Sequence, residues 1–206
     1  MAASGQACVS LEKKFQWSTT DATTWKTLFS SSAILGISLG SIFGGKFSGY
    51  CGKRMVIIVA EFIVIPSALI RTIFDPHEYQ IMLGNLVHGF GAGLIVSATA
   101  KIIEETVPLH VQDRGFGTST NMMINVAIMI NMLLGMGMPT GTPQLIRTVY
   151  WKTFFLIPIP FAVVSLVILM CIMRTDSLLY HVKRDEKAKA MQILSSIYKE
   201  EDEATH

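Results

Sequence analysis

Charged side chains are scarce in this sequence. Asp, Glu, Lys and Arg make up 16% of its 206 residues, whereas soluble domains carry about 25%. The net charge is only +2, so the chain lacks the basic surplus that is typical of nucleic-acid-binding proteins. We therefore expect neither an ordinary soluble domain nor a nucleic-acid partner.

Cysteine is also rare, and its three copies lie far apart at Cys8, Cys51 and Cys171. This spacing fits neither a disulfide framework nor a metal site. The stretch from Met1 to Gln16 lacks a basic start followed by an apolar core, so we predict no cleavable signal peptide. The three cysteines are interpreted as small apolar residues.

The sequence also lacks signs of catalysis. Gly89 to Gly93 is rich in glycine, but the dinucleotide motif G-x-G-x-x-G fails at Leu94 and no strand precedes it. No nucleophile and base stand in a catalytic arrangement. The sequence therefore predicts a protein that is not an enzyme and that needs no cofactor or metal.

Long apolar runs are what the sequence has in abundance. Half of its residues (50%) are hydrophobic, and they gather in blocks of about 20, the length that crosses a bilayer as a helix. The pattern predicts an integral, multi-pass membrane protein, in the plasma membrane or an internal membrane. The expected spans are Trp25–Gly45, Met55–Phe74, Ile81–Ile103, Gly115–Pro139 and Val149–Met173.

The stretch from Thr24 to Arg54 organises the rest of the chain. Small residues recur along one face of its expected helix, which would let another helix approach closely. They are Ser32, Gly36, Gly40, Gly44, Gly45 and Gly49. A short turn that ends in Lys53-Arg54 then leads into the next span, so we predict a membrane hairpin with a basic cytoplasmic bend.

The positions of Lys and Arg set the predicted orientation. With the Lys53-Arg54 bend inside, most of the 17 Lys and Arg residues, Lys101 among them, are also inside, while Arg71 is among the outer ones. The N-terminus is then outside and the C-terminus inside. From Asp185 to Lys199, apolar residues repeat at helical spacing opposite charged ones, which predicts a short amphipathic helix at the inner surface.

The hairpin resembles a known motif. The run Gly45-x-x-x-Gly49-Tyr50-x-Gly52-Lys53-Arg54 resembles the loop between helices 2 and 3 of major facilitator superfamily transporters, G-x-x-x-D-R-x-G-R-R/K. The first and last glycines and the basic pair match, whereas Gly49 and Tyr50 replace the central acidic and basic residues. The alternative interpretation is an unrelated tight, positively charged membrane turn.

Further motifs follow in the order of the family. The glycines of the third span are placed as in helix 4 of sugar-porter members, with Asn85 in place of an Arg. Glu105 and then Arg114-Gly115 resemble the loop between helices 4 and 5. Asp176-Ser177 resembles the acidic motif after helix 6.

This resemblance implies an all-α fold, a polytopic transmembrane helical bundle like the N-terminal half of a major facilitator transporter. It covers helices 2 to 6 of the twelve, about five spans plus the cytoplasmic amphipathic helix. We divide the chain into residues 1–23 (remnant of helix 1 and outer loop), 24–173 (bundle) and 174–206 (cytoplasmic helix and acidic tail).

The resemblance also implies a cytoplasmic gate. In the family, ionic contacts at this face latch the two halves of the transporter, and the matching charges here are Arg54, Glu105, Arg114 and Asp176. The gate motifs also include Gly45, Gly52, Lys53, Gly115 and Ser177. Exposed ion pairs are individually weak, roughly 0–1 kcal/mol, which suits a gate that opens. Charges that only set topology are the alternative.

Polar residues in the fourth span are candidate solute ligands. Asn121 and Asn125 lie one turn apart on a shared face, near Thr118. Carboxamides donate and accept hydrogen bonds, as sugar hydroxyls require; interhelical hydrogen bonding is the alternative. Met122 takes the position of a sugar-contacting Gln of the family, which also permits another solute, such as phosphate or an organic ion.

Two titratable groups lie at membrane depth, Glu61 and His88. Such groups are costly there and are functional candidates, here for carrying a proton. A neutral His88 packed between Gly84 and Gly91 is the alternative. The proton-coupling carboxylate of the family lies in helix 1 and its Arg partner is replaced by Asn85, so the resemblance does not predict proton coupling.

Two classes of function follow from these patterns. In the first, the chain is part of a solute carrier in the bilayer, with alternating access that requires a missing C-terminal half or a partner chain, and it takes a small polar, sugar-like solute. In the second, it is a truncated, non-transporting membrane protein that associates with a full-length carrier or is inert.

Overall fold

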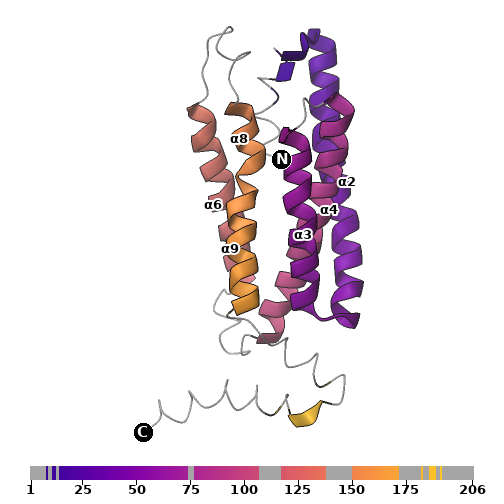
Figure 1. The fold of residues 1–206 in the computed structure, drawn as a ribbon, viewed down its shortest axis with the longest axis vertical. Helices are drawn as coiled ribbons and strands as arrows, with labels where there is room; N and C mark the ends of the chain where they lie inside the picture. Colours follow the sequence, from indigo (N-terminus) through magenta and orange to yellow (C-terminus); the bar gives the residue numbers. More distant parts are fainter. Residues whose placement is uncertain are drawn as a thin grey trace.

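The structure is a computed structural model that describes residues 8, 11–12, 14–73, 77–106, 117–137, 150–171, 182, 186–188 and 191. Within these ranges the principal elements are all helices, arranged as an elongated bundle (Figure 1). They are α2 (Thr19–Tyr50), α3 (Lys53–Ile73), α4 (Glu78–Thr106), α6 (Gly117–Met136), α8 (Tyr150–Leu156) and α9 (Pro158–Cys171). The all-α prediction is confirmed.

Four stretches are long and apolar enough to cross a membrane: Thr19–Tyr50, Lys53–Thr72, Glu78–Glu105 and Trp151–Cys171. The apolar helix at Asn121–Met136 is shorter, although α6 as a whole has 20 residues. Large apolar side chains remain exposed all along the bundle, as expected for a surface that faces lipid rather than water.

The first helix is longer than predicted. It begins at Thr19 rather than near Trp25, so the expected boundary after residue 23 falls inside α2. Ser18 has extended backbone geometry in front of the helix, and Asp21 lies in the first turn, where a carboxylate is favoured by the helix dipole. Asp21 thus favours a helix start in this polar stretch, ahead of the apolar part of α2.

The last predicted span consists of two helices. α8 ends at Leu156 and α9 begins at Pro158, with Ile157 between them. Proline has no N–H to donate within a helix but fits well in its first turn. The break therefore follows from the position of Pro158, and the two helices still continue one another along the bundle (Figure 1).

The tightest contact in the bundle joins α2 to α4. The buried residues of α2 include Gly36, Gly40 and Gly44. A methyl group added at Gly36 or Gly40 would collide with main-chain atoms of α4, and the same holds in reverse for Gly89. The glycine face predicted from the sequence is thus confirmed at these positions, and the structure identifies its partner as α4.

Two apolar clusters hold the ends of the bundle. We call the end that carries Lys53 the inner end, following the predicted orientation. The inner cluster joins α3, α4 and α9 through Val56, Ile57, Ala60, Leu94, Ala98 and Leu169. The outer cluster combines residues from the N-terminal segment, α2, α4 and α8, namely Cys8, Leu11, Phe29, Ile81, Trp151 and Phe155.

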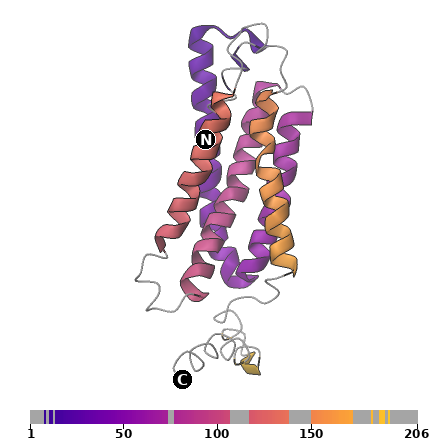
Figure 2. The ribbon, with the colours of Figure 1, turned by 90° about the vertical axis from the view of Figure 1, so that its left-hand side faces the viewer.

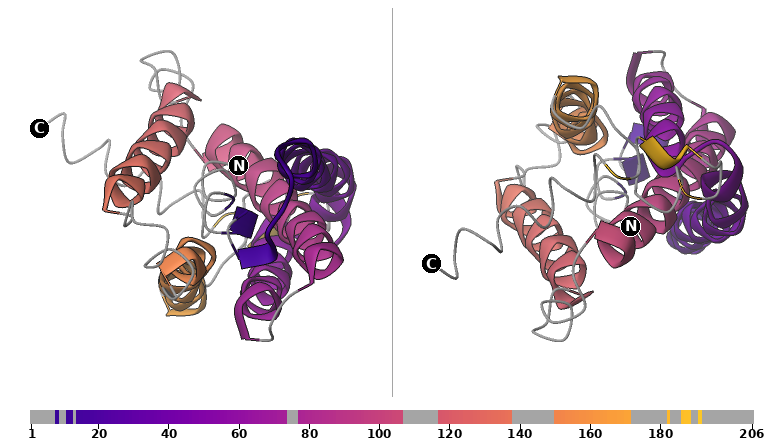
Figure 3. Two further views of the ribbon diagram at one scale, coloured as in Figure 1. Left: turned by 90° about the horizontal axis from the view of Figure 1, so that it is seen from above. Right: turned by 90° about the horizontal axis from the view of Figure 1, so that it is seen from below.

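α6 is set apart from this packing. It lies on the opposite side of the bundle from α2, and α8 and α9 stand closer to α3 than α6 does (Figures 1 and 3). Every residue from Asn121 to Ile130 is exposed. The view in Figure 2 shows that α6 still runs along the bundle in the same general direction as its neighbours.

Candidate functional site at the inner end

The inner end is built around the turn between α2 and α3. Gly52 has φ of 89°, a conformation that residues with a side chain rarely adopt. The Cys51 N–H donates to the carbonyl of Phe47 and closes α2. α3 then begins at Lys53. The glycine of the motif is therefore required by the backbone, and it sets where the two basic residues emerge.

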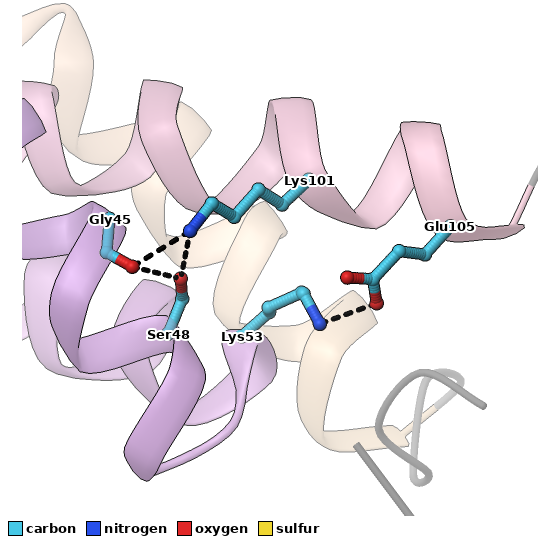
Figure 4. Close-up of polar contacts among 5 residues, drawn as sticks. All are labelled: Gly45, Ser48, Lys53, Lys101 and Glu105. Atoms are coloured by element: carbon cyan, nitrogen blue, oxygen red, sulfur yellow. Dashed lines mark hydrogen bonds and ion pairs between the residues drawn. The ribbon is translucent and has the colours of Figure 1, made fainter. Parts of the chain in front are cut away.

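Lys53 turns inward and pairs with the last turn of α4. Its Nζ lies 2.5 Å from Oε2 of Glu105 (Figure 4). The two side chains are 6% and 19% exposed, so the pair is more protected from water than an ordinary surface ion pair. It joins residues 52 positions apart in the chain. Lys53 thus ties the start of α3 to the end of α4.

A second lysine on the same face of α4 secures α2. Lys101 precedes Glu105 by one helical turn, so both project from one side of α4. Its Nζ donates to the Gly45 carbonyl (2.7 Å) and to Ser48 Oγ (3.3 Å) (Figure 4). Since a charged donor strengthens a hydrogen bond, Lys101 anchors the last turns of α2 on α4.

Arg54 connects this turn to α9. Its Nε donates to the main-chain carbonyl of Leu169 at 3.0 Å. That carbonyl lies in the last turn of α9, where main-chain acceptors have no helical partner and a cation is favoured. Lys53, Arg54 and Lys101 together link the inner ends of α2, α3, α4 and α9.

The structure describes three of the predicted gate-motif charges. Lys53 pairs with Glu105, whereas Arg54 donates to the Leu169 carbonyl. Lys101 was predicted only as an inner-face charge, and its position four residues before Glu105 is the signal that could have revealed its role. The predicted gate residues Arg114, Gly115, Asp176 and Ser177 lie outside the described residues, as does most of the predicted amphipathic helix.

The candidate solute ligands lie on α6. Asn121 and Asn125 are exposed, as is Met122 between them. Thr118 belongs to the same helix. Asn131 differs, because its amide donates to the Ala127 carbonyl one turn earlier at 3.1 Å. The structure therefore leaves the shared face of Asn121 and Asn125 open within this chain.

The two intramembrane titratable groups occupy separate places. Glu61 is 5% exposed and lies on α3. His88 Nδ1 lies 3.2 Å from Ser67 Oγ, so it faces α3. The Cβ of an alanine at Gly91 would approach Val64 and Ala60 rather than His88. His88 thus has a polar partner on a neighbouring helix.

These features define a class of protein: a polytopic helical membrane protein whose spans are tied together at one end by basic residues, of which Lys53 is buried. A profile of the family described as "Sugar (and other) transporter" matches residues 3–205. The chain belongs to this family of transporters, within the major facilitator superfamily.

Relatives of known identity agree with this assignment. The chain is 25% identical over 187 residues to "Probable inositol transporter 3" of Arabidopsis thaliana, with 90% of this chain and 30% of the relative covered. It is 26% identical to "Inositol transporter 4" of the same plant, which is covered to 29%. "Hexose transporter 1" of Toxoplasma gondii is 21% identical and covered to 31%. The chain spans about a third of the length of these relatives.

Solved structures share the fold. The proton:xylose symporter XylE bound to 6-bromo-6-deoxy-D-glucose superposes with a TM-score of 0.73 at 20% identity, covering 95% of this chain and 45% of that one. The inward-open form of XylE from E. coli gives a TM-score of 0.72 at 19% identity, with 95% and 48% covered. The described helices thus have the arrangement of one half of a major facilitator transporter.

Proposed function

We propose that this chain forms one half of an alternating-access carrier for a small sugar-like or polyol solute. The observation that carries this proposal is the open face of α6, where Asn121 and Asn125 lie one turn apart on a helix that the rest of the chain leaves exposed. A carboxamide both donates and accepts hydrogen bonds, which suits a polyhydroxyl solute. The membership of the family supports the same conclusion.

The inner-end ties give this half its mechanical role. Transporters of this kind rock two rigid halves around a site near the middle of the membrane. Lys53, Arg54 and Lys101 hold the inner ends of four helices together, so the half can move as a unit. Arg54, Glu105, Arg114 and Asp176 would then form contacts with the opposite half that break as the carrier opens inward. No covalent chemistry is required.

A second half completes the site in this proposal. It is supplied by further sequence or by a partner chain, because one half leaves α6 open on one side. Two of the relatives are named as inositol transporters and one as a hexose transporter. Inositol is therefore the first solute to test, and hexoses are the second.

The proposal can be tested by flux measurements in liposomes. The chain is reconstituted alone, and also together with the C-terminal half of the Arabidopsis Inositol transporter 4, and uptake of labelled inositol is followed. We expect uptake only in the combined sample, reduced at least tenfold by Asn125→Ala. Asn131→Ala is the matched control, because that side chain bonds within its own helix. Uptake by the chain alone would contradict the need for a second half.

Competition identifies the solute class. Unlabelled inositol and glucose should compete with the labelled solute, whereas inorganic phosphate and small organic acids should not. Competition by phosphate or an acid alone would replace the polyol with an anionic solute, which Met122 and Asn85 permit.

A second candidate function is a non-transporting subunit that associates with a full-length carrier. The observation in its favour is that every residue of α6 from Asn121 to Ile130 is exposed, which leaves this helix free to pack against another membrane protein. Affinity purification of the tagged chain with a co-expressed full-length relative tests this directly. Stable co-purification combined with no flux in the two-half experiment would favour the subunit over the carrier.

A further inference from the structure

A buried arginine lies near the outer end of α3. Arg71 is only 3% exposed, and the sequence placed it among the outer charges. Its Nε donates to the Ser67 carbonyl at 3.1 Å, one turn earlier in the same helix. Its Nη1 donates to Oδ1 of Asn85 on α4 at 2.9 Å, and the guanidinium lies 4.8 Å from the centroid of the Phe155 ring of α8.

Two donors of this cluster have no acceptor in the part of the chain that the structure describes. They are Nη2 of Arg71 and Nδ2 of Asn85, and Asn85 is only 2% exposed. A guanidinium carries only donors and always keeps its charge. A buried charge and a buried amide are both costly without partners. Every unmet group here requires an acceptor, and none requires a donor.

Of the described carboxylates at this end, Glu78 accepts from Nε1 of Trp17 at 3.1 Å. The described contacts of Arg71 include no carboxylate. His88, which contacts Ser67, cannot supply negative charge. Among the described residues, the positive charge of Arg71 thus meets a carbonyl oxygen, an amide oxygen and the face of Phe155.

Gly84 of the neighbouring helix α4 makes room for the Arg71 side chain. A Cβ added at Gly84 would lie 2.5 Å from Cγ of Arg71 and 2.9 Å from its Cδ. Gly84 therefore leaves the space through which the stem of Arg71 reaches Asn85. This requirement and the two hydrogen bonds fix the guanidinium between α3, α4 and α8, so that its remaining donor has a defined position.

We propose that Arg71 and Asn85 form a buried receptor for a single carboxylate group at the outer end of the bundle. A carboxylate has two acceptor oxygens and a negative charge, so it matches two neighbouring donors and the unbalanced cation. The group comes either from a small free acid or from an acidic side chain of protein that packs here. This inference is independent of the proposed transport function.

Thermal unfolding of the full chain in detergent tests the receptor, with acetate as the probe. We expect the Tm of the wild type to rise by about 3 °C or more on addition of 100 mM sodium acetate, since a ligand bound only by the folded state stabilises it. Arg71→Met should lose this rise. The difference between the two proteins removes any general effect of salt.

Asn85→Asp is the second, independent variant. It places a carboxylate where Oδ1 already accepts from Arg71, so its Tm in acetate-free buffer should exceed that of the wild type and should no longer respond to acetate. A higher Tm for this variant with no acetate response in the wild type would assign the carboxylate to a protein side chain instead of a free acid.

Two outcomes would overturn the receptor. One is an equal acetate response in the wild type and Arg71→Met, which would mark an adventitious effect. The other is a lower Tm for Asn85→Asp together with no acetate response in the wild type. Because the measurement reads stability and not flux, a failure here leaves the carrier proposal untouched, and the reverse also holds.

Discussion

α2 and α6 are both apolar helices, yet their surroundings are opposite. α2 presents glycines to α4, so that the two main chains touch. α6 has Asn, Met and branched apolar residues on its surface, and its residues from Asn121 to Ile130 are all exposed. The hydrophobic effect does not drive two apolar helices together inside a lipid bilayer, so close packing depends on small residues that let the backbones approach.

The comparison shows that the same bundle contains a tightly packed helix pair, α2 with α4, and an exposed helix, α6. The inner ends of α2, α3 and α4 are further joined by Lys53 and Lys101. On α6, by contrast, the amide of Asn131 bonds within its own helix, to the Ala127 carbonyl. We infer that the α2–α4 pair provides rigidity and that the face of α6 is available for a partner or solute.

The largest effect is expected at the glycine contact. Gly40→Val would place two methyl groups against the main chain of α4 near Phe90 and Gly93, and overpacking typically costs about 1–3 kcal/mol, occasionally more. We expect a loss of roughly 3 kcal/mol in the free energy of unfolding, followed by circular dichroism in detergent.

Gly49→Ala is the matched control within the same helix. A Cβ at Gly49 would meet nothing within 4 Å, and alanine favours a helix over glycine by about 1 kcal/mol. This variant should be as stable as the wild type or slightly more so. Equal destabilisation by both variants would contradict a specific α2–α4 contact.

The next effect is expected at the ion pair of the inner end. Lys53→Met leaves the partly buried Glu105 without this partner, and we expect a loss of roughly 2 kcal/mol, below the 3–5 kcal/mol of a fully buried pair. Adding Glu105→Gln should recover part of the loss, since the carboxylate charge is then removed as well. Chemical denaturation of the two single variants and the double variant measures the coupling. Strict additivity would show that the pair does not contribute.

Smaller effects on stability are expected on α6. Asn121→Ala and Asn125→Ala change exposed side chains, and such substitutions usually shift stability by no more than about 0.5 kcal/mol. The same variants should lower flux in the two-half experiment. A large loss of stability would instead make these carboxamides structural, and the contrast between α2 and α6 would disappear.

The last prediction concerns the reactivity of the cysteine thiols and involves no change in stability. Cys8 is 6% exposed, and burial raises the pKa of its thiol despite the nearby Lys26, whereas Cys51 is exposed in the inner turn. The thiolate is the reactive form, so a raised pKa means less thiolate at a given pH. We expect a maleimide to label the exposed Cys51 and Cys171 before Cys8, and Cys8 to react slowly and only as the pH rises. Mass spectrometry of a time course checks this, and equal rates at pH 7 would place Cys8 in an open position.

The sequence alone identified the membrane class, the helices and the motifs of the inner turn, because these depend on local properties. A run of about 20 apolar residues needs a helix in lipid whatever its neighbours are. Gly52 was predicted as a motif glycine, and the turn requires it there. The gate role of Arg54, Glu105, Arg114 and Asp176, and the ligand role of Asn121 and Asn125, stay predictions.

Long-range pairing could not be predicted in the same way. The small face of α2 needed a partner, but nothing local to the chain selected α4 over the other spans. Lys101 and Arg71 were read as charges that mark the two sides of the membrane. Their hydrogen bonds to Gly45 and Asn85 depend on how helices distant in the chain align along the bundle.

The amino-acid sequence by itself showed that this protein is a helical membrane protein of the sugar transporter family. The signals for this are hydropathy, glycine spacing and basic turns, and each can be recognised in the sequence without the structure. Only the tertiary structure decided which charges are buried and which helix stays open. The reason is physical: burying the charge of Arg71 or Lys53 is favourable only where another helix places an acceptor oxygen beside it. That contact forms only when the helices pack in the folded bundle.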